Sequence, residues 1–255
     1  QVLSGASVTL ALDIPAAANP NDVTWSDGLV GCSRTLDDVT SDVSLTATYG
    51  GIDYTFTVQV KIKGDYTYYS MLTSDKGYSL VTSTTELEQL ANDHFFVLAS
   101  DVADLLIGLK DAPNNGNKAL FFESPTNPVG DLSKVFTIEL TDGFCHLRNI
   151  DYDGLTLQTE WNRPDQLRTH DQPYACEWSR LSLAFDNGAW TVENGKYPGN
   201  WLGLLTPTHG FVDGEEIACN KTGGDIAHLQ IFAIDRSRFY ADYIAQATED
   251  KPFNV

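Results

Sequence analysis

The segment NGKYPGNWLGLLTP (residues 194–207) places a turn rich in Gly and Pro directly before a short apolar run that contains Trp201. Similar apolar runs occur at LLIGL (105–109) and GLTLQ (154–158), each after an aromatic-led run that ends in a polar turn. The runs are centred on Gly108, Thr156 and Gly203, so they recur at about 48 residues, a spacing typical of repeated structural units. The opening segment therefore belongs to the third copy of a repeat.

Each copy contains four short strand-like runs. The first and fourth runs are NDHFFVLAS and KVFTIEL in the first copy, TDGFCHLRN and SRLSLAF in the second, and DNGAWTVEN and LQIFAID in the third. The third runs are KALFFES, YACEW (174–178) and EEIACNK. A unit of four short strands cannot bury its own apolar face, whereas three such units together can.

Three copies of four strands resemble a β-trefoil, in which six strands close a barrel and three hairpins cap it. We predict this fold for residues 93–235, with repeats at about 93–140, 141–185 and 186–235. The alternatives are a set of propeller blades or a second β-sandwich. Because three units are too few for an ordinary propeller, the trefoil is favoured.

Residues 1–63 read as all-β. SVTLALDI (7–14) alternates apolar and polar residues, and two β-rich runs flank Gly50–Gly51. DVTWSDG (22–28) carries Trp25, an isolated tryptophan that we predict to be a core residue. This pattern resembles a small bacterial immunoglobulin-like β-sandwich without the paired cysteines of antibody domains. The chain as a whole is therefore predicted to be all-β, with an immunoglobulin-like domain followed by a trefoil.

Two segments lie outside these domains. Residues 64–92 form a predicted connector, in which TSTTELEQL indicates a single helical turn capped by Thr84 or Thr85. Residues 236–255 form a predicted C-terminal tail, with a short helix through Tyr240 and Ile244 that frays after Lys251–Pro252.

Composition narrows the choice of partners. The 255 residues include 35 acidic and 16 basic side chains, for a formal net charge of −19. Such a surface repels phosphate backbones, so we expect no nucleic acid partner. No apolar run is long enough to span a bilayer, and because the chain starts at Gln1 we expect a mature or trimmed product whose leader has been removed.

The chain shows no trusted catalytic or metal-binding motif. Its five histidines have no metal-ligand spacing and are expected at the surface or in turns. The pair Asp151 and Asp153 matches only a fragment of a calcium loop. We expect no cofactor, no metal and no enzymatic activity, and the four cysteines are expected to be buried free thiols, with a Cys176–Cys219 bridge left open.

Aromatic residues beside polar loops suggest a binding surface. Aromatic rings stack on the apolar faces of sugars, while amide, carboxylate, imidazole and guanidinium groups bond the hydroxyls. That mixture occurs after Trp161, in a polar loop reaching to about residue 173, and around Trp201. The candidate ligand-binding residues are Trp161, Asn162, Arg163, Asp165, His170, Tyr197, Asn200, Trp201 and His209. The alternative is that Trp161 and Trp201 are core residues, as we expect for Trp178 and Trp190 within alternating strands.

The predicted trefoil is similar to lectins of the ricin B kind, whose repeats carry Q-x-W. Only LQIF, with Gln230 and Phe232, approaches that motif here, so the family's sugar-binding residues are not transferred. The domain layout also resembles secreted and surface proteins of gut Bacteroidetes, which implies an extracellular or cell-surface location.

The leading hypothesis is a non-catalytic binding protein whose trefoil recognises a glycan. A structural or adhesive subunit of a surface or phage-particle assembly, binding another surface protein, is the main alternative. A protease inhibitor presenting the loop at 162–173 is a further one, and an enzyme would require two carboxylates in a cleft.

Overall fold

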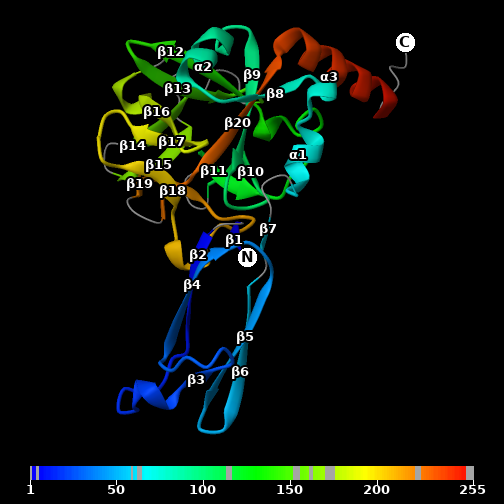
Figure 1. Cartoon of the computed structure of the whole chain (residues 1–255). Coiled ribbons are helices and arrows are strands. Elements are labelled where there is room, and N and C mark those ends of the chain that lie inside the picture. The colour runs from blue at the N-terminus through cyan, green and yellow to red at the C-terminus, as the bar shows by residue number, and fades with distance from the viewer. Residues whose placement is uncertain are drawn as a thin grey trace. The chain divides into compact units, whose positions relative to one another are not determined.

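In a computed structural model of the chain, the backbone is described for residues 2–3, 6–58, 60–61, 65–112, 117–151, 156–160, 163–169, 176–221 and 225–250. These residues divide into two compact units, 1–66 and 67–255. Both are built mainly from strands (Figure 1). The chain is therefore all-β in class, with a few short helices and one longer helix near the C-terminus.

Unit 1 contains three small sheets. Its elements are β1 (Val2–Leu3), β2 (Ala6–Ala11), η1 (Pro20–Asp22), β3 (Thr24–Trp25), β4 (Ser33–Val39), β5 (Val43–Tyr49), β6 (Ile52–Val58) and β7 (Val60–Lys61). Strands β2 and β4 pair, β5 lies between β3 and β6, and β1 runs parallel to β7. Gly50 and Gly51 both adopt positive φ, which allows the predicted two-residue turn between β5 and β6.

Trp25 forms the centre of the core of unit 1. Its side chain is buried with Val23, Leu45 and Ala47, and its ring centroid lies 5.3 Å from that of Phe56. The indole N–H donates to the carbonyl of Gly31 at 2.8 Å, so the one polar atom of the ring is satisfied. The prediction of an isolated core tryptophan in this unit is confirmed.

Unit 2 begins with α1 (Thr67–Met71), η2 (Ser74–Lys76), β8 (Tyr78–Val81) and α2 (Thr84–Leu90). Twelve strands follow, four in each predicted repeat. They are β9 (His94–Ser100), β10 (Leu106–Asp111), β11 (Lys118–Glu123), β12 (Phe136–Thr141), β13 (Phe144–Asn149), β14 (Leu157–Glu160), β15 (Arg163–Thr169), β16 (Leu181–Asp186), β17 (Ala189–Asn194), β18 (Trp201–Leu204), β19 (Ile217–Lys221) and β20 (Leu229–Asp235). Short 3-10 turns occur at η3 (Leu132–Lys134), η4 (Glu177–Ser179) and η5 (Pro207–His209), and α3 (Arg236–Asp250) ends the described chain.

Six of these strands close a ring. The pairs β12–β13, β16–β17 and β20–β9 are joined by β9–β12, β13–β16 and β17–β20. The remaining strands form the hairpins β10–β11, β14–β15 and β18–β19, which pair with one another through β11–β15 and β15–β19. Closure of the ring leaves its six strands without a free edge.

The core of unit 2 lies inside this ring. Inward-facing side chains from the ring strands, including Phe96, Phe136 and Trp190, are fully buried. The indole N–H of Trp190 donates to the carbonyl of Val81 at 2.8 Å, which ties the ring to β8. The prediction that Trp190 is a core residue is confirmed.

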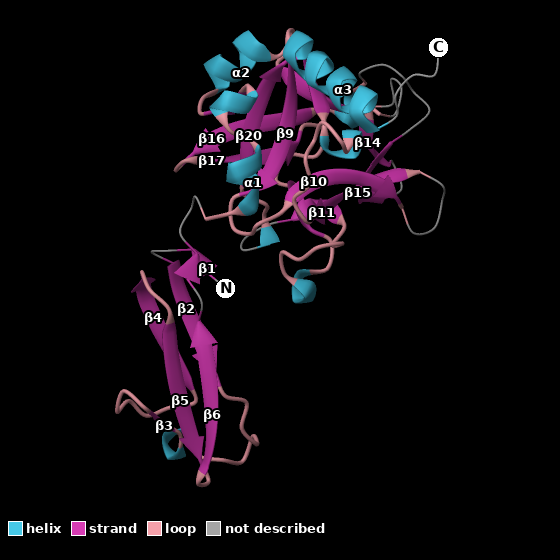
Figure 2. Ribbon diagram, turned by 90° about the vertical axis from the view of Figure 1, so that its right-hand side faces the viewer, coloured by secondary structure: helices cyan, strands magenta, loops and turns pink. Residues whose placement is uncertain are grey.

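Helices α2 and α3 lie at the same end of unit 2, and Figure 2 shows both above β9 and β20. Helix α2 is capped by Ser83, whose hydroxyl accepts the N–H of Glu86 at 3.2 Å, so the predicted cap at Thr84 or Thr85 was wrong by at least one residue. The predicted tail helix is present as α3, and it is longer than expected.

Three predictions about the second repeat and the histidines were wrong. The described part of YACEW, residues 176–178, is not a strand, because residues 177–179 form η4, and the third described strand of this repeat is β15. The stretch predicted to be a polar loop after Trp161 forms that strand over 163–169, with Leu167 pointing into the core. His146 is buried rather than exposed, and its Nδ1 lies 2.8 Å from the hydroxyl oxygen of Ser179.

The four cysteines are free, as predicted. Cys145 and Cys219 are buried, whereas Cys32 and Cys176 are only partly so. Burial raises the pKa of Cys219 to about 12 and also raises the pKa of Cys145. Since a thiolate is the reactive form of cysteine, these two thiols are core residues and not nucleophiles.

Candidate binding surface on the third repeat

The first strand of each repeat ends in a polar side chain that shapes the following turn. Ser100, Asn149 and Asn194 occupy this place, and each side-chain oxygen accepts a hydrogen bond from the backbone N–H two residues further on. Such bonds hold a turn without help from a sheet. The loops that follow β9, β13 and β17 are therefore fixed locally at their first residues.

The turn after β17 is held by several further hydrogen bonds. The Asn194 carboxamide oxygen accepts the N–H groups of Lys196 at 3.0 Å and Tyr197 at 3.1 Å. The Asn200 side chain donates to the carbonyl of Tyr197 at 3.0 Å, and Gly199 N–H donates to the Glu193 carboxylate at 2.6 Å. The Lys196–Asn200 turn is consequently held in one conformation before any ligand arrives.

Gly195 is required for this arrangement. A Cβ atom at this position would lie 2.7 Å from a ring carbon of Phe144 and 2.9 Å from the Cβ of Arg180. Only glycine allows the turn to approach these neighbours, and its N–H donates to the carbonyl of Arg180 at 2.8 Å. The close approach brings the turn beside η4.

The turn and η4 together present two aromatic rings. Trp178 of η4 and Tyr197 of the turn are both half-buried, and their ring centroids lie 6.1 Å apart at 55°. The ammonium of Lys196 lies 3.4 Å from the centroid of the Trp178 ring and 2.5 Å from a carboxylate oxygen of Glu177. We call these four residues, with Asn200, the aromatic turn surface.

Trp201 begins β18 directly after the turn and is half-buried. It pairs with Glu193 of β17 and Lys221 of β19, so it lies at the end of the β18–β19 hairpin that adjoins the turn. Two of the predicted residues, Tyr197 and Asn200, are in direct contact, and Trp201 follows them in the chain. The structure thus brings this part of the prediction together.

His209 lies at the other end of the same hairpin. Strand β18 alone, at about 3.3 Å per residue, separates the turn from the β18–β19 loop by roughly 10 Å. The His209 side chain is 59% exposed, and its Nδ1 lies 2.8 Å from the carboxylate of the buried Glu215. That carboxylate also accepts the N–H of Thr206 at 2.6 Å, so His209 belongs to a separate loop from the aromatic turn surface.

The remaining predicted residues cannot be placed as side chains. Trp161, Asn162 and His170 lie outside the described residues, and Arg163 and Asp165 are described only as backbone of β15. The prediction of ligand contacts at these five positions stays a prediction.

Trp178 was missed because YACEW was interpreted as an alternating strand with a core tryptophan. The structure corrects this: Trp178 lies on η4 and is half-buried. The sequence signal that could have located Trp178 is the segment EWS directly before an alternating run. This order indicates a short turn immediately before the fourth strand of the repeat. An equivalent 3-10 turn, η3, precedes β12 in the first repeat.

The buried acidic groups of unit 2 are committed to structural partners. Glu216 is paired with Arg168 at 2.9 Å, and Glu123 is paired with Lys110. Within the described ranges, His, Cys, Asp and Glu side chains form no group of three that could hold a metal ion. The described helices include none that is long and apolar enough to cross a membrane.

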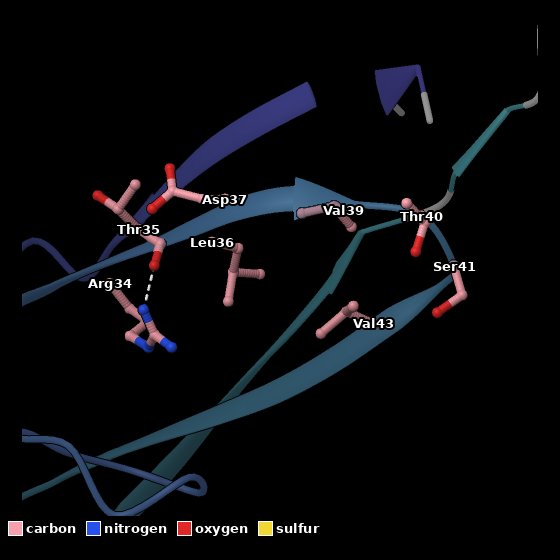
Figure 3. Close-up of a pocket in the computed structure, with 8 residues that line it drawn as sticks. All are labelled: Arg34, Thr35, Leu36, Asp37, Val39, Thr40, Ser41 and Val43. Carbon is pink, nitrogen blue, oxygen red and sulfur yellow. Dashed lines mark hydrogen bonds between the residues drawn. The ribbon is translucent and has the colours of Figure 1, made fainter. Parts of the chain in front are cut away.

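Unit 1 contains a hollow of about 340 Å³ between β4 and the start of β5 (Figure 3). Leu36 and Val43 line its apolar side, and Thr35 and Ser41 line its polar side. The Arg34 guanidinium at one end already pairs with Asp27 at 2.7 Å. The hollow lies between β4 and β5, which belong to two sheets that share no pairing among the described strands.

Comparison with solved structures finds partial likeness. The chain is similar to the Polyporus squamosus lectin (16% identity, TM-score 0.42, covering 55% of this chain and 48% of that one). It is similar to the Rhizoctonia solani agglutinin (14% identity, TM-score 0.43, covering 56% and 96%). It is also similar to a GlcNAcα1-4Gal releasing endo-β-galactosidase from Clostridium perfringens (15% identity, TM-score 0.44, covering 56% and 33%).

No protein-family model matches the chain, and no curated protein matches it. The match spans about a third of the endo-β-galactosidase and about half of the Polyporus lectin. The lectins and the glycosidase are thus structural neighbours over about half of this chain.

Proposed function

We propose that this protein is a non-catalytic carbohydrate-binding protein. In this proposal residues 93–235 are a three-repeat β-trefoil that recognises a glycan, and residues 1–63 are an immunoglobulin-like spacer. Residues 64–92 connect the two, and residues 236–255 form the tail. An extracellular or cell-surface location belongs to the same proposal.

The observation that carries the proposal is the aromatic turn surface. It holds two half-buried aromatic rings, Trp178 and Tyr197, and aromatic rings suit the C–H faces of sugar rings. The Lys196 ammonium lies over the Trp178 ring and pairs with Glu177, and Asn200 bonds the Tyr197 carbonyl, so these polar groups lie close to the rings and can bond hydroxyl groups. Because the turn is already ordered, a ligand would not have to supply the entropy of ordering it.

Glu177 of this surface and the neighbouring Glu193 are both engaged by other groups and do not form a catalytic pair. Glu177 is engaged by Lys196, and Glu193 accepts the Gly199 N–H. A glycosidase needs two carboxyl groups on opposite sides of the scissile bond, one of them free to give up a proton. Binding without cleavage is the function that these side chains support best.

A glycan array tests the proposal with full-length wild-type protein and the variants Trp178→Ala, Tyr197→Ala and Trp201→Ala. We expect the wild type to bind a defined glycan and Trp178→Ala to lose that signal. Tyr54→Ala is the matched control, because Tyr54 is an exposed aromatic residue of unit 1. A blank array with folded protein, or binding that survives in all three variants, would reject this assignment.

A second candidate function is adhesion through unit 1. Large apolar side chains are exposed near one end of that unit: Leu29 is 50%, Val30 60% and Ile52 59% exposed. Exposed apolar groups in neighbouring turns favour contact with another protein. If the array is blank, Leu29→Ser combined with Ile52→Ser should abolish binding to a partner protein, and unchanged binding would exclude this surface.

A further inference from the structure

Strand β6 lies at the edge of its sheet in unit 1. Among the described strands it pairs with β5 alone, and the register runs without a break from the Val43–Val58 pair to the Tyr49–Ile52 pair. Residues 52–57 are exposed except for Phe56, which is partly buried. The long side of β6 that faces away from β5 is therefore free to accept a further strand, and we call it the open side of β6.

The turn before β6 determines which backbone groups point to the open side. The Tyr49–Ile52 pair closes the two-residue turn at Gly50–Gly51, and the closing pair of such a hairpin is hydrogen-bonded. Hydrogen-bonded and non-hydrogen-bonded pairs alternate along an antiparallel ladder. The N–H and C=O groups of Asp53, Thr55 and Thr57 consequently point away from β5, and they offer donors and acceptors to an added strand.

The open side of β6 lacks the usual protection of an edge strand, which is charge, proline or a bulge. The strand contains no proline and no lysine, and its pairing with β5 shows no register shift. Its one charged residue is Asp53, whose carboxylate accepts the Thr48 hydroxyl of β5 at 2.7 Å and is thus directed away from the open side. By comparison, β4 pairs only with β2 among the described strands and carries Arg34 and Asp37.

The sequence of β6 is complementary to itself in the antiparallel direction. When two copies are centred on Thr55, this residue opposes its own counterpart, and Asp53 opposes Thr57 of the second copy. All three outward residues are then paired with one another, and no two carboxylates are opposed. A register centred on Asp53 would oppose two like charges, which is destabilising. A register centred on Thr57 would need residues 60–61, which already pair with β1.

On the other face of β6 the same register brings apolar side chains together. Ile52 opposes Val58 of the second copy, and Tyr54 opposes Phe56. Cross-strand pairs of aromatic and β-branched residues stabilise antiparallel sheets. Because Ile52 is 59% and Tyr54 39% exposed in the single chain, pairing removes apolar surface from water.

We propose that the open side of β6 pairs with β6 of a second copy of this chain, so that two three-stranded sheets become one continuous sheet. One pair of strands buries less area than the interface of a stable dimer, so this dimer is weak and forms as the concentration rises. Two chains of net charge −19 repel each other, so salt strengthens the pairing through screening. The proposal gives unit 1 a role beyond that of a spacer and does not rest on glycan binding.

Sedimentation equilibrium of the full chain at high salt, from about 10 µM to about 500 µM, measures the dimer. We expect a monomer–dimer equilibrium in the wild type. Thr55→Pro should weaken dimerisation about tenfold or more, because it removes an outward N–H, whereas proline is tolerated at the free edge of a monomer. Thr55→Val is the matched control, since it keeps the N–H and a β-branched side chain and should dimerise like the wild type. The indole N–H resonance of Trp25 reports whether unit 1 of each variant is folded.

Disulfide trapping tests the register independently. The background is Cys32→Ser with Cys176→Ser, which removes the two partly exposed thiols. Thr55→Cys should form a covalent dimer on oxidation, because directly opposed residues have Cα atoms about 5.5 Å apart, within disulfide range. Thr57→Cys is the control, because two copies of this position are four residues apart along the paired strands, roughly 13 Å, and cannot be bridged.

A wild type that stays monomeric over the whole concentration range would overturn the proposal, as would a folded Thr55→Pro that dimerises like the wild type. If Thr55→Pro does not fold, the trapping decides, and equal cross-linking at positions 55 and 57 would overturn the pairing. Trp178→Ala should dimerise like the wild type. Failure of this proposal is therefore distinguishable from failure of the glycan-binding function.

Discussion

At the scale of single residues, polar side chains of this protein hold turns and neighbouring chain segments in place through hydrogen bonds. Asn149 shows the principle: its amide nitrogen lies within 3.0 Å of three carbonyl oxygens, those of Leu132, Ser133 and Val135. Lys134 is equally committed, since its ammonium bonds Ser124, Thr126 and Asp131. These buried polar groups fix the conformation of the chain segments that lead into the ring strands.

The buried side chain of His146 predicts that the free energy of unfolding depends on pH. Burial is the main cause that lowers its pKa below 6.5, so the folded protein keeps this imidazole neutral. The unfolded chain takes up the proton as the pH falls through about 6.5, so the contribution of His146 to the free energy of unfolding decreases below that pH. The loss between about pH 7 and about pH 5 should be smaller in His146→Gln than in the wild type.

Urea unfolding at the two pH values measures this difference. His228→Gln is the control, because it makes the same substitution at an exposed histidine. An equal loss of stability in wild type and His146→Gln would show that this buried histidine is not the group responsible.

At the scale of elements, caps and turns decide where helices and hairpins begin. Two hydrogen bonds hold the start of α2: Ser83 accepts the Glu86 N–H, and the Glu86 carboxylate accepts the N–H of Thr82, the residue before the cap, at 2.8 Å. The run of Ser and Thr residues from 82 to 85 offers four possible caps, so the sequence located the helix and did not locate its first residue. The packing of Leu87 into the core selects the register.

Ser83→Ala should destabilise the protein by about 1 kcal/mol through loss of the cap. Thr85→Ala is the matched control, because Thr85 is exposed inside α2 and alanine is the better helix former. Chemical denaturation followed by circular dichroism measures both variants. Equal effects, or a larger loss in Thr85→Ala, would contradict the cap assignment.

At the scale of the whole molecule, two compact units each surround a tryptophan. Trp25 fills the core of unit 1, and Trp190 lies within the ring of unit 2. Each unit has its own hydrophobic cluster, so each is expected to have its own unfolding transition.

Trp190→Ala should therefore lower the stability of unit 2 by about 3–5 kcal/mol and leave unit 1 folded. The indole N–H resonance of Trp25, followed by NMR during thermal unfolding, reports on unit 1 directly. A Trp25 resonance that disappears together with the signals of unit 2, at the lowered temperature, would show one cooperative structure instead of two.

The sequence by itself determined what is periodic and local. The recurrence of apolar runs located the twelve strands of the repeats except for one, and the Gly50–Gly51 turn and the core positions of Trp25 and Trp190 followed from alternation and turn chemistry. It also located Tyr197, Asn200 and Trp201 beside one turn. These features depend on residues a few positions apart, and that is the range over which backbone preference and amphipathic pattern act.

The tertiary structure alone decided the features that depend on contacts between distant parts of the chain. The third strand of the second repeat is rich in polar residues, and β15 exists because β11, β14 and β19 supply partners for its backbone. Trp178 and Tyr197 are 19 residues apart, and they meet because Gly195 lets the turn approach η4. The open side of β6 has no sequence signal, because whether a strand gains a second neighbour depends on what distant segments bring to it.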